Sequence, residues 1–467
     1  MVFNSFNFFI FFIAVVTLYF SIPHRFRWAL LLIASCIFYM FLIPVYIFII
    51  WATIIIDYFM GICIEKGGSK KKLYLLLSMV ANLSILVFFK YYNFLNENLG
   101  VILHGVGYRN LLPYLNIALP IGLSFHTFQA MSYTIDIYRG QQKAERHFGI
   151  YALYIMFFPQ LVAGPIERAH NMLHQFYEKH YFNAEKSISG LQLILWGLYK
   201  KVVVADTIAI YVNSIYDNPS SNNGLTLVIA TYAFAFQIYC DFSGYSDIAV
   251  GSARILGFEL TQNFRLPYFS KSVSEFWRRW HISFSTWLRD YLYIPLGGNR
   301  SGKIKMLRNI LITMLLGGLW HGASWNFILW GALNGAYLCI EKMLSSFGMK
   351  VLPWKPLKVF ITFNLICFSW IFFRADTFHN ASLIVRNIFS VHEFFNVRIQ
   401  DVEIFVSMLV KIILLLAIEF FLLRKHSLDF SEKKHPWIWS LSFNTFLIIL
   451  IVVFGVKEGT QFIYFQF

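Results

Sequence analysis

Charge is scarce in this sequence. Only 13% of its 467 residues are charged, whereas 58% are hydrophobic, and the mean hydropathy is +0.59. A soluble protein of this length could not cover so much apolar surface with polar side chains. The composition therefore excludes a soluble globular protein and predicts a polytopic membrane protein, whose 51 phenylalanines suit helices that face lipid.

Acidic residues are scarcer than basic ones. The sequence has 24 Asp and Glu against 39 Lys and Arg, which gives a formal net charge of +15. In a membrane protein such an excess of basic residues marks the cytoplasmic loops. No RNA- or DNA-binding motif accompanies this charge, so the sequence does not predict a nucleic acid as a partner.

Cysteines with a paired spacing are also lacking. The five cysteines all fall in apolar segments, at Cys36, Cys63, Cys240, Cys339 and Cys367. This arrangement predicts neither a disulfide framework nor a metal site. The G-x-S-x-G pattern is absent as well, which argues against a serine nucleophile on a sharp strand-to-helix turn.

Basic clusters between the apolar stretches predict the topology. The run 5–22 has no basic region before it and Pro23 after it, so we expect a retained helix and not a cleaved signal. The basic group that follows the run, from His24 to Arg27, places the N-terminus outside the cytoplasm, and the later clusters place the C-terminus outside as well. The same clusters place both flanks of 148–164 in the cytoplasm, which predicts a re-entrant segment buried in protein.

Two histidines stand out in the stretch 276–330, each directly after a tryptophan. His281 occurs in RRWHIS, a charged and aromatic segment, and His321 occurs in GLWHGASW, at the end of an apolar run. An ionisable group inside a membrane is costly and is usually functional. Each histidine also has a structural alternative: His321 as a hydrogen-bonded helix contact, and His281 as a residue of the membrane interface.

The depth of His321 follows from the rise of a helix. Arg308 lies thirteen residues before it, which corresponds to about 20 Å of helix, inside a hydrocarbon core roughly 30 Å thick. The chain then returns to Glu341 and Lys342. We therefore expect a helical hairpin that turns at Gly322–Ser324, with His321 at its tip.

The segment 276–292 has a helical period. If it forms one helix, the aromatic residues Trp277, Trp280, Phe284, Trp287 and Tyr291 share one face, and Arg278, His281, Ser285 and Arg289 share the other. This pattern predicts an amphipathic helix at the membrane surface. It is either an anchor alone or the lining of an entrance for an anionic acyl donor, with Arg278, Arg279 or Arg289 on its phosphates.

Two carboxylates interrupt another apolar run. Asp241 and Asp247 lie in CDFSGYSDIAVG, together with Ser243 and Tyr245. Such groups are expensive in a membrane unless they are paired or face water. A pair between Asp247 and Arg254 would be structural, whereas an orienting contact to a histidine or a contact to an acceptor sugar would be functional. A metal site is not favoured, because no ligand spacing is present.

Several motifs together resemble the membrane-bound O-acyltransferase family, and most closely its bacterial alginate O-acetyltransferase branch. The motifs are DFSGYSDIAVG (241–251), FWRRWHISFSTWLRDYLYIPLGGNR (276–300) and GLWHGASWN (318–326), with further matches at 124–140, 157–168, 372–375 and 462–467. The teichoic acid D-alanyl transfer proteins are more distant. The resemblance identifies His321 with the catalytic histidine of the family and His281 with its second histidine.

This resemblance implies a fold and a reaction. The fold would be a single all-helical membrane domain over 1–467, with about 11 transmembrane helices and with re-entrant and interfacial helices around a central cavity that contains histidine. N-terminal helices would occupy 1–140, the core 141–345 and C-terminal helices 346–467. The location would be the bacterial plasma (inner) membrane.

The implied reaction is the transfer of an acyl group, acetyl by the resemblance, from a cytoplasmic thioester such as acetyl-CoA. The receiver is a hydroxyl of an exported polysaccharide or a partner protein outside the cytoplasm that completes the transfer. His321 would act as general base, and His281 or Asn326 would stabilise the oxyanion. No bound cofactor and no metal are expected. Two other functions stay open: a transporter or flippase, and a docking subunit of a polysaccharide export complex.

Overall fold

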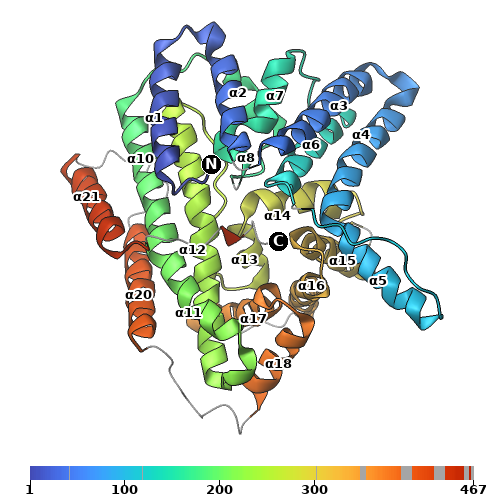
Figure 1. Cartoon of the computed structure of the whole chain (residues 1–467), viewed down its shortest axis with the longest axis vertical. Helices are drawn as coiled ribbons and strands as arrows, with labels where there is room; N and C mark the ends of the chain where they lie inside the picture. The colour runs from blue at the N-terminus through green and yellow to red at the C-terminus, as the bar shows by residue number, and fades with distance from the viewer. Residues whose placement is uncertain are drawn as a thin grey trace. The chain divides into compact units, whose positions relative to one another are not determined.

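The computed structural model describes residues 1–41, 43–117, 119–162, 164–300, 302–347, 354–390, 402–424, 437–456 and 462–463. All regular structure in these ranges is helical (Figure 1), so the predicted all-helical fold class is confirmed. Contacts group the chain into two compact units, Met1–Ser187 with Ser252–Thr261 and Ile188–Gly251 with Gln262–Phe467. Each unit is described by itself.

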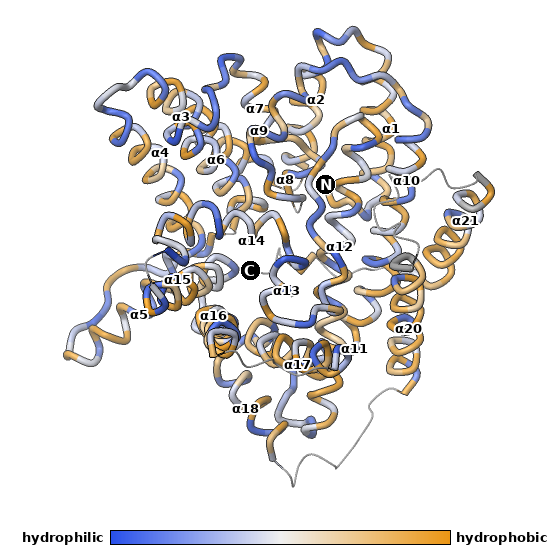
Figure 2. Tube along the Cα trace, turned by 180° about the vertical axis from the view of Figure 1, so that it is seen from behind, coloured by the Kyte–Doolittle hydropathy of each residue, from blue (hydrophilic) through white to orange (hydrophobic). Residues whose placement is uncertain are grey.

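Long apolar helices confirm a multi-pass membrane protein. Five helices in the described ranges are long and apolar enough to cross a bilayer, namely Pro44–Lys66, Gly68–Gly105, Gly224–Leu256, Lys355–Arg374 and Val402–Phe421. Figure 2 shows helices α20 (Val402–Arg424) and α21 (Trp437–Phe454) as almost continuously hydrophobic. The total of about 11 spans stays a prediction.

The first unit is built from α1 Phe6–Ser21, α2 His24–Met40, α3 Ile47–Lys66, α4 Lys71–Leu86, α5 Tyr92–Gly105, α6 Leu123–Tyr138, α7 Phe148–Met156, α8 Phe158–Leu161 and α9 Ala169–Met172. Local signals set some of the starts. The Ser5 hydroxyl accepts a hydrogen bond from the Phe8 amide at 3.2 Å and so caps α1, and Pro44 begins the short turn before α3.

Helices α3, α4 and α6 pack on one another around a buried carboxylate. Asp57 of α3 is fully buried and accepts hydrogen bonds from the Ser78 hydroxyl at 2.6 Å and from the Asn82 amide at 2.8 Å, both on α4. The Ser78 hydroxyl also lies 3.1 Å from that of Thr134 on α6. A buried carboxylate is tolerated only with such partners, so this cluster fixes the three helices side by side.

The segment 148–164, predicted to be re-entrant, is divided into two short helices, and its course relative to the membrane stays a prediction. Helix α7 ends at Met156 and α8 begins at Phe158, and both are buried within the first unit. The side-chain amides of Gln129 and Gln160 both donate to the Tyr154 carbonyl, at 2.6 and 2.7 Å, and so satisfy backbone exposed by the break. Ala163 lies outside the described residues.

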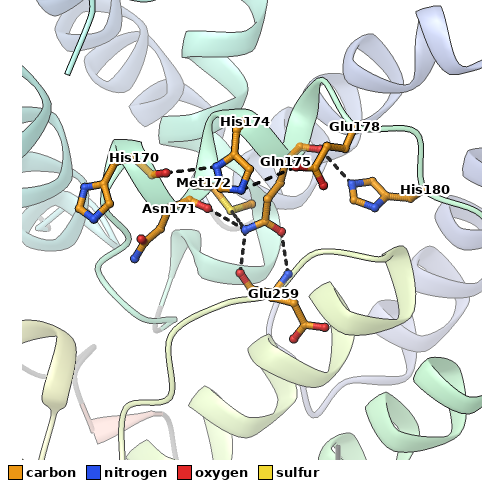
Figure 3. A network of polar contacts seen from close by, with 8 residues as sticks. All are labelled: His170, Asn171, Met172, His174, Gln175, Glu178, His180 and Glu259. Atoms are coloured by element: carbon orange, nitrogen blue, oxygen red, sulfur yellow. Dashed lines mark hydrogen bonds and ion pairs between the residues drawn. The ribbon is translucent and has the colours of Figure 1, made fainter.

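A network of polar contacts around Gln175 links two segments of the first unit (Figure 3). The Gln175 amide donates to the carbonyls of Asn171 at 2.8 Å and Glu259 at 3.0 Å, and its oxygen accepts from the Glu259 amide at 2.8 Å. A ring nitrogen of His180 lies 2.9 Å from the Gln175 carbonyl. One glutamine thereby joins the segment after α9 to the segment 257–261.

The second unit holds most of α10 Ala184–Leu198 and of α12 Gly224–Leu256, followed by the helices that carry both histidines. Its other elements are η5 Tyr199–Ala205, α11 Asp206–Tyr216, α13 Val273–Arg279, α14 Ile282–Leu288, η8 Arg289–Tyr293, α15 Lys303–His321, α16 Trp325–Ser346, α17 Lys355–Arg374, α18 Phe378–Phe389, α20 and α21. Helix α16 packs on α13, α15 and α17, so it is the element around which the histidine segments gather.

Candidate functional site

The predicted helical hairpin is confirmed by α15 and α16, which lie side by side in Figure 1. They are joined at Gly322–Ser324, and His321 is the last residue of α15. Glycines allow the close approach: a Cβ on Gly318 would lie 2.2 Å from the Phe327 carbonyl oxygen, and one on Gly331 would lie 2.4 Å from that of Met314. The hairpin therefore holds His321 rigidly at its tip.

Aromatic rings surround His321. Its side chain is buried, with 4% of the residue exposed, and ring centroids lie 4.9 to 5.4 Å from its own. The rings are those of Phe284, Trp320, Trp330 and Phe373. They come from α14, α15, α16 and α17, so four helices fix the position of one imidazole.

His281 lies in the same aromatic cluster. It is 1% exposed, and its ring lies 4.6 Å from Phe242 and 5.0 Å from Phe284. Phe284 and Trp320, which contact the ring of His321, also contact that of His281. Burial lowers the pKa of His281 well below its ordinary value, so its ring is neutral.

The prediction of one continuous helix over 276–292 is wrong. Helix α13 ends at Arg279 and α14 begins at Ile282, and between them His281 has a left-handed backbone with φ of 43°. The break turns His281 into the cluster, so it does not share an exposed face with the arginines. Sequence periodicity cannot show such a break, because no glycine or proline marks it.

The neighbouring loop explains why the helix stops. The Arg265 amide donates to the Arg279 carbonyl at 2.9 Å, and the Ile282 amide donates to the Asn263 carbonyl at 2.9 Å. The Asn263 side-chain oxygen accepts from the Ser283 amide at 3.2 Å, and Asn263 is 1% exposed. These bonds satisfy amides at the start of α14 and hold His281 in its unusual conformation.

Two side chains cap the start of α13, in an arrangement close to a capping box. The Ser272 hydroxyl accepts from the Glu275 amide at 3.1 Å, and the Glu275 carboxylate accepts from the Lys271 amide at 2.8 Å. Glu275 also pairs with Arg279 at 2.6 Å. One carboxylate therefore fixes both the start and the last turn of the helix that leads to His281.

The three arginines expected at an acyl donor differ in their surroundings. Arg279 is paired with Glu275, Arg289 is paired with Asp290 at 2.7 Å, and Arg278 is exposed. Their role toward a donor stays a prediction.

Asn326 is the second residue of α16, close to the hairpin tip. Its side-chain amide donates to the Ala375 carbonyl at 2.7 Å, and it is 3% exposed. Its side-chain oxygen is enclosed and accepts no hydrogen bond from the described residues. Because the amide ties α16 to the end of α17, Asn326 is better placed to hold the hairpin than to donate to an oxyanion.

The carboxylates of α12 meet two lysines that the sequence analysis did not select. Lys201 is fully buried and lies 2.6 Å from Asp241 and 2.8 Å from Asp206. Lys200 lies 2.6 Å from Asp247 and donates to the Ser243 hydroxyl at 2.8 Å.

The structural alternative in the sequence analysis paired Asp247 with Arg254, on its own helix, and overlooked a cation from another segment. A signal was present in the adjacent lysines inside an apolar run, which form part of the π-helix η5. Because isolated buried charges are costly, carboxylate and ammonium groups that occur together in apolar runs are expected to pair with one another.

The same cluster reaches His281 through the end of the chain. A carboxylate oxygen of Asp241 accepts from the Ile463 amide at 2.7 Å. The ring of Phe462 lies 4.2 Å from Tyr245 and 5.9 Å from Phe242, and Phe242 contacts His281. Asp241 and Tyr245 therefore hold the wall of the histidine cluster and do not contact the imidazoles through the interactions observed here.

Known proteins resemble this chain over the part that carries both histidines. Residues 139–375, a range that includes His281 and His321, match the model of the MBOAT, membrane-bound O-acyltransferase family. The chain is 36% identical to the probable alginate O-acetylase AlgI of Pseudomonas putida, over 100% of both chains.

Two further relatives differ in what their names say they modify. The chain is 33% identical to the peptidoglycan O-acetyltransferase of Helicobacter pylori, over 94% of this chain and 91% of that one. It is 26% identical to the teichoic acid D-alanyltransferase of Bacillus subtilis, over 56% of this chain and 70% of that one.

Proposed function

The chain belongs to the membrane-bound O-acyltransferase family, and on that basis we propose that it transfers an acetyl group from a cytoplasmic thioester to a hydroxyl of an exported cell-envelope polysaccharide. The observation that supports this most directly is a pair of buried histidines that share the rings of Phe284 and Trp320, with His321 at the tip of the α15–α16 hairpin and His281 in the break between α13 and α14. The acetyl donor would be acetyl-CoA or another thioester.

His321 acts as the general base in this proposal. A hydroxyl is a weak nucleophile at neutral pH, so His321 takes its proton while the oxygen attacks the thioester carbonyl carbon. The new C–O bond forms, the C–S bond breaks, and the proton passes from His321 to the departing thiolate. The enclosed position of the imidazole keeps water away from the thioester during this step.

His281 stabilises the negative charge that develops on the carbonyl oxygen. Its ring is neutral, and a neutral imidazole can donate one hydrogen bond without introducing a buried charge. The ring of His281 can donate to the carbonyl oxygen only if it points toward it. The direction of the ring is set by the left-handed backbone of His281 and by the hydrogen bond between Asn263 and the start of α14. Asn263 is therefore a positioning residue for His281.

Asn263→Ala is expected to lower kcat about 5- to 10-fold, because it removes one hydrogen bond from the start of α14. Asn263→Asp, which keeps an acceptor for the Ser283 amide, should restore most of the rate. In a His281→Ala background, Asn263→Ala should cause little further loss. An equal loss in both backgrounds would show that Asn263 acts on stability alone.

Arg278, Arg279 and Arg289 belong to the donor side of this proposal. Their segment lies in a basic, aromatic region suited to the cytoplasmic membrane surface, and Arg278 and Arg289 are both exposed and accessible to a phosphate. Asp241, Ser243, Tyr245 and Asp247 act indirectly, by holding the second unit together around His281.

The acceptor is a polysaccharide because the relatives that cover most of this chain are named for alginate and peptidoglycan. A partner protein outside the cytoplasm could receive the acetyl group and complete the transfer. Comparison of polymers from cells with and without the gene, by mass spectrometry, tests the acceptor. Purified protein with acetyl-CoA and a short alginate oligosaccharide as probes tests the reaction. Unchanged O-acetyl content and no transfer in vitro would contradict the proposal.

The proposed sidedness can be tested by cysteine labelling in a cysteine-free background. Ser301, in the basic loop before α15, lies outside the described residues, so Lys305 serves as the cytoplasmic probe and the exposed Ser220 as the outer one. Lys305→Cys should react with a membrane-impermeant maleimide only from the cytoplasm, and Ser220→Cys only from outside. Labelling of both sites from one face would exclude a relay across the membrane.

A further inference from the structure

A buried donor next to His321 has no acceptor. The indole nitrogen of Trp330 is enclosed and donates to no acceptor in the described part of the chain, although the residue is only 1% exposed. Leaving an indole N–H unpaired in a buried site costs about 1–3 kcal/mol. A cost of this kind needs an explanation, and a group that is present only during the reaction supplies one.

The position of Trp330 fits such a group. Its ring centroid lies 5.0 Å from that of His321, and the two rings are nearly perpendicular, at 85°. The imidazole of His321 must lie within hydrogen-bond distance of the attacking hydroxyl. The hydroxyl oxygen bonds to the carbonyl carbon, so the carbonyl oxygen also lies close to the imidazole, within about the width of one ring. Trp330 is one helical turn after Asn326, whose amide is already committed to Ala375.

The indole is held firmly in place. It stacks on Trp370 at 5.8 Å and 22°, meets Phe373 at 5.4 Å, and lies 5.7 Å from Trp277. Of the four rings that contact His321, Phe284 and Phe373 carry no donor, whereas Trp320 and Trp330 each carry an indole N–H, and of these two it is that of Trp330 that is buried without an acceptor among the described residues. A preorganised donor is worth most where water is excluded, because it needs no reorientation as the charge develops.

We propose that Trp330 is a further catalytic residue, whose indole N–H donates a hydrogen bond to the acyl carbonyl oxygen as the thioester is attacked. This inference rests on the proposed function and adds a second hydrogen-bond donor, besides His281, to the acyl carbonyl oxygen. When the hydroxyl oxygen bonds to the carbonyl carbon, the C=O electron pair moves onto the oxygen and Trp330 stabilises it. The pair returns as the C–S bond breaks, and the proton held by His321 passes to the thiolate.

The test removes the N–H and keeps the ring. Trp330→Phe is expected to lower kcat about 10²–10³-fold, as loss of one oxyanion donor does, while the KM for acetyl-CoA changes less than about twofold. The matched control is Trp196→Phe, which removes the indole of another buried tryptophan, on α10, whose observed ring contact is with Tyr199 and not with His321 or Trp330. It should leave kcat within about threefold of the unmodified protein.

A second variant covers the case in which Trp330→Phe fails to fold. Benzothienylalanine at position 330 has the shape of tryptophan with sulfur in place of N–H, and it should reproduce the loss of kcat in a protein with unchanged melting temperature. Near-normal kcat in either folded variant, or an equal loss in Trp196→Phe, would overturn the inference. If the unmodified protein transfers no acetyl group, the proposed function fails instead, so the two failures are distinguishable.

Discussion

Purified protein with His321→Ala is expected to lose acyl transfer by about 10²–10⁴-fold or to fall below detection, because the variant lacks the base that takes the hydroxyl proton. The fold should survive, since the hairpin is held by the glycine contacts of α15 with α16 and by Asn326. The measurement is transfer of labelled acetyl from acetyl-CoA, together with the melting temperature.

A matched histidine control is available on the surface of the first unit. His174 is exposed and lies 3.7 Å from the exposed Glu178, so His174→Ala should change neither the transfer rate nor the melting temperature. Near-normal transfer by the folded His321→Ala variant would remove His321 from the chemistry and favour a structural role for it.

Lys201→Met is expected to destabilise the protein by about 3–5 kcal/mol, since it leaves two buried carboxylates without their cation. Lys201 and Asp206 have no exposed side-chain surface, and Asp241 is almost as deeply buried. Loss of this cation also weakens the position of Asp241, which holds the Ile463 amide beside the wall of the His281 cluster. The measurement is thermal unfolding in detergent, with protein yield as a second readout.

The control for this effect is an exposed ion pair. Lys186 lies 3.3 Å from Glu259, and about half of each side chain is accessible, so Lys186→Met should change stability by less than about 1 kcal/mol. Lys201→Met combined with Asp206→Asn should recover part of the loss, because one uncompensated charge is then removed. If Lys201→Met alone melts like the unmodified protein, the buried pairs do not hold the second unit together.

Local signals made part of the fold predictable. The apolar run ending in His321, the glycines near it and the returning run to Glu341 predicted the hairpin of α15 and α16, because helix length and turn residues are properties of contiguous sequence. The basic flanks of 148–164 likewise predicted a segment that does not cross the membrane as one helix, and the chain there is divided into α7 and α8.

Contacts between distant segments made the rest unpredictable. The helix break at His281 depends on Asn263 and Arg265, which lie on another loop and carry no periodic signal. Lys200 and Lys201 find their acids on other elements, so the sequence suggested a partner for Asp247 within its own helix. The unfilled donor of Trp330 becomes visible only when its surroundings are known.

Several features inferred from the sequence remain predictions. The division of one membrane domain at 140 and 345, the placement of both termini outside the cytoplasm and the location in the inner membrane are among them. Of the terminal motif FIYFQF, only Phe462 and Ile463 are within the described residues. The roles of the three arginines toward the donor also stay predictions.

The most direct test of the central claim is the fate of a labelled acetyl group in oriented proteoliposomes. Acetyl-CoA labelled in the acetyl group is supplied at the cytoplasmic face of the protein, and a hydroxyl-bearing oligosaccharide is supplied at the opposite face. The account predicts a new O-acetyl ester on the oligosaccharide, release of free coenzyme A only on the donor side, and neither product with His321→Ala. Movement of intact acetyl-CoA or oligosaccharide across the bilayer without a new ester would contradict it and identify a transporter instead.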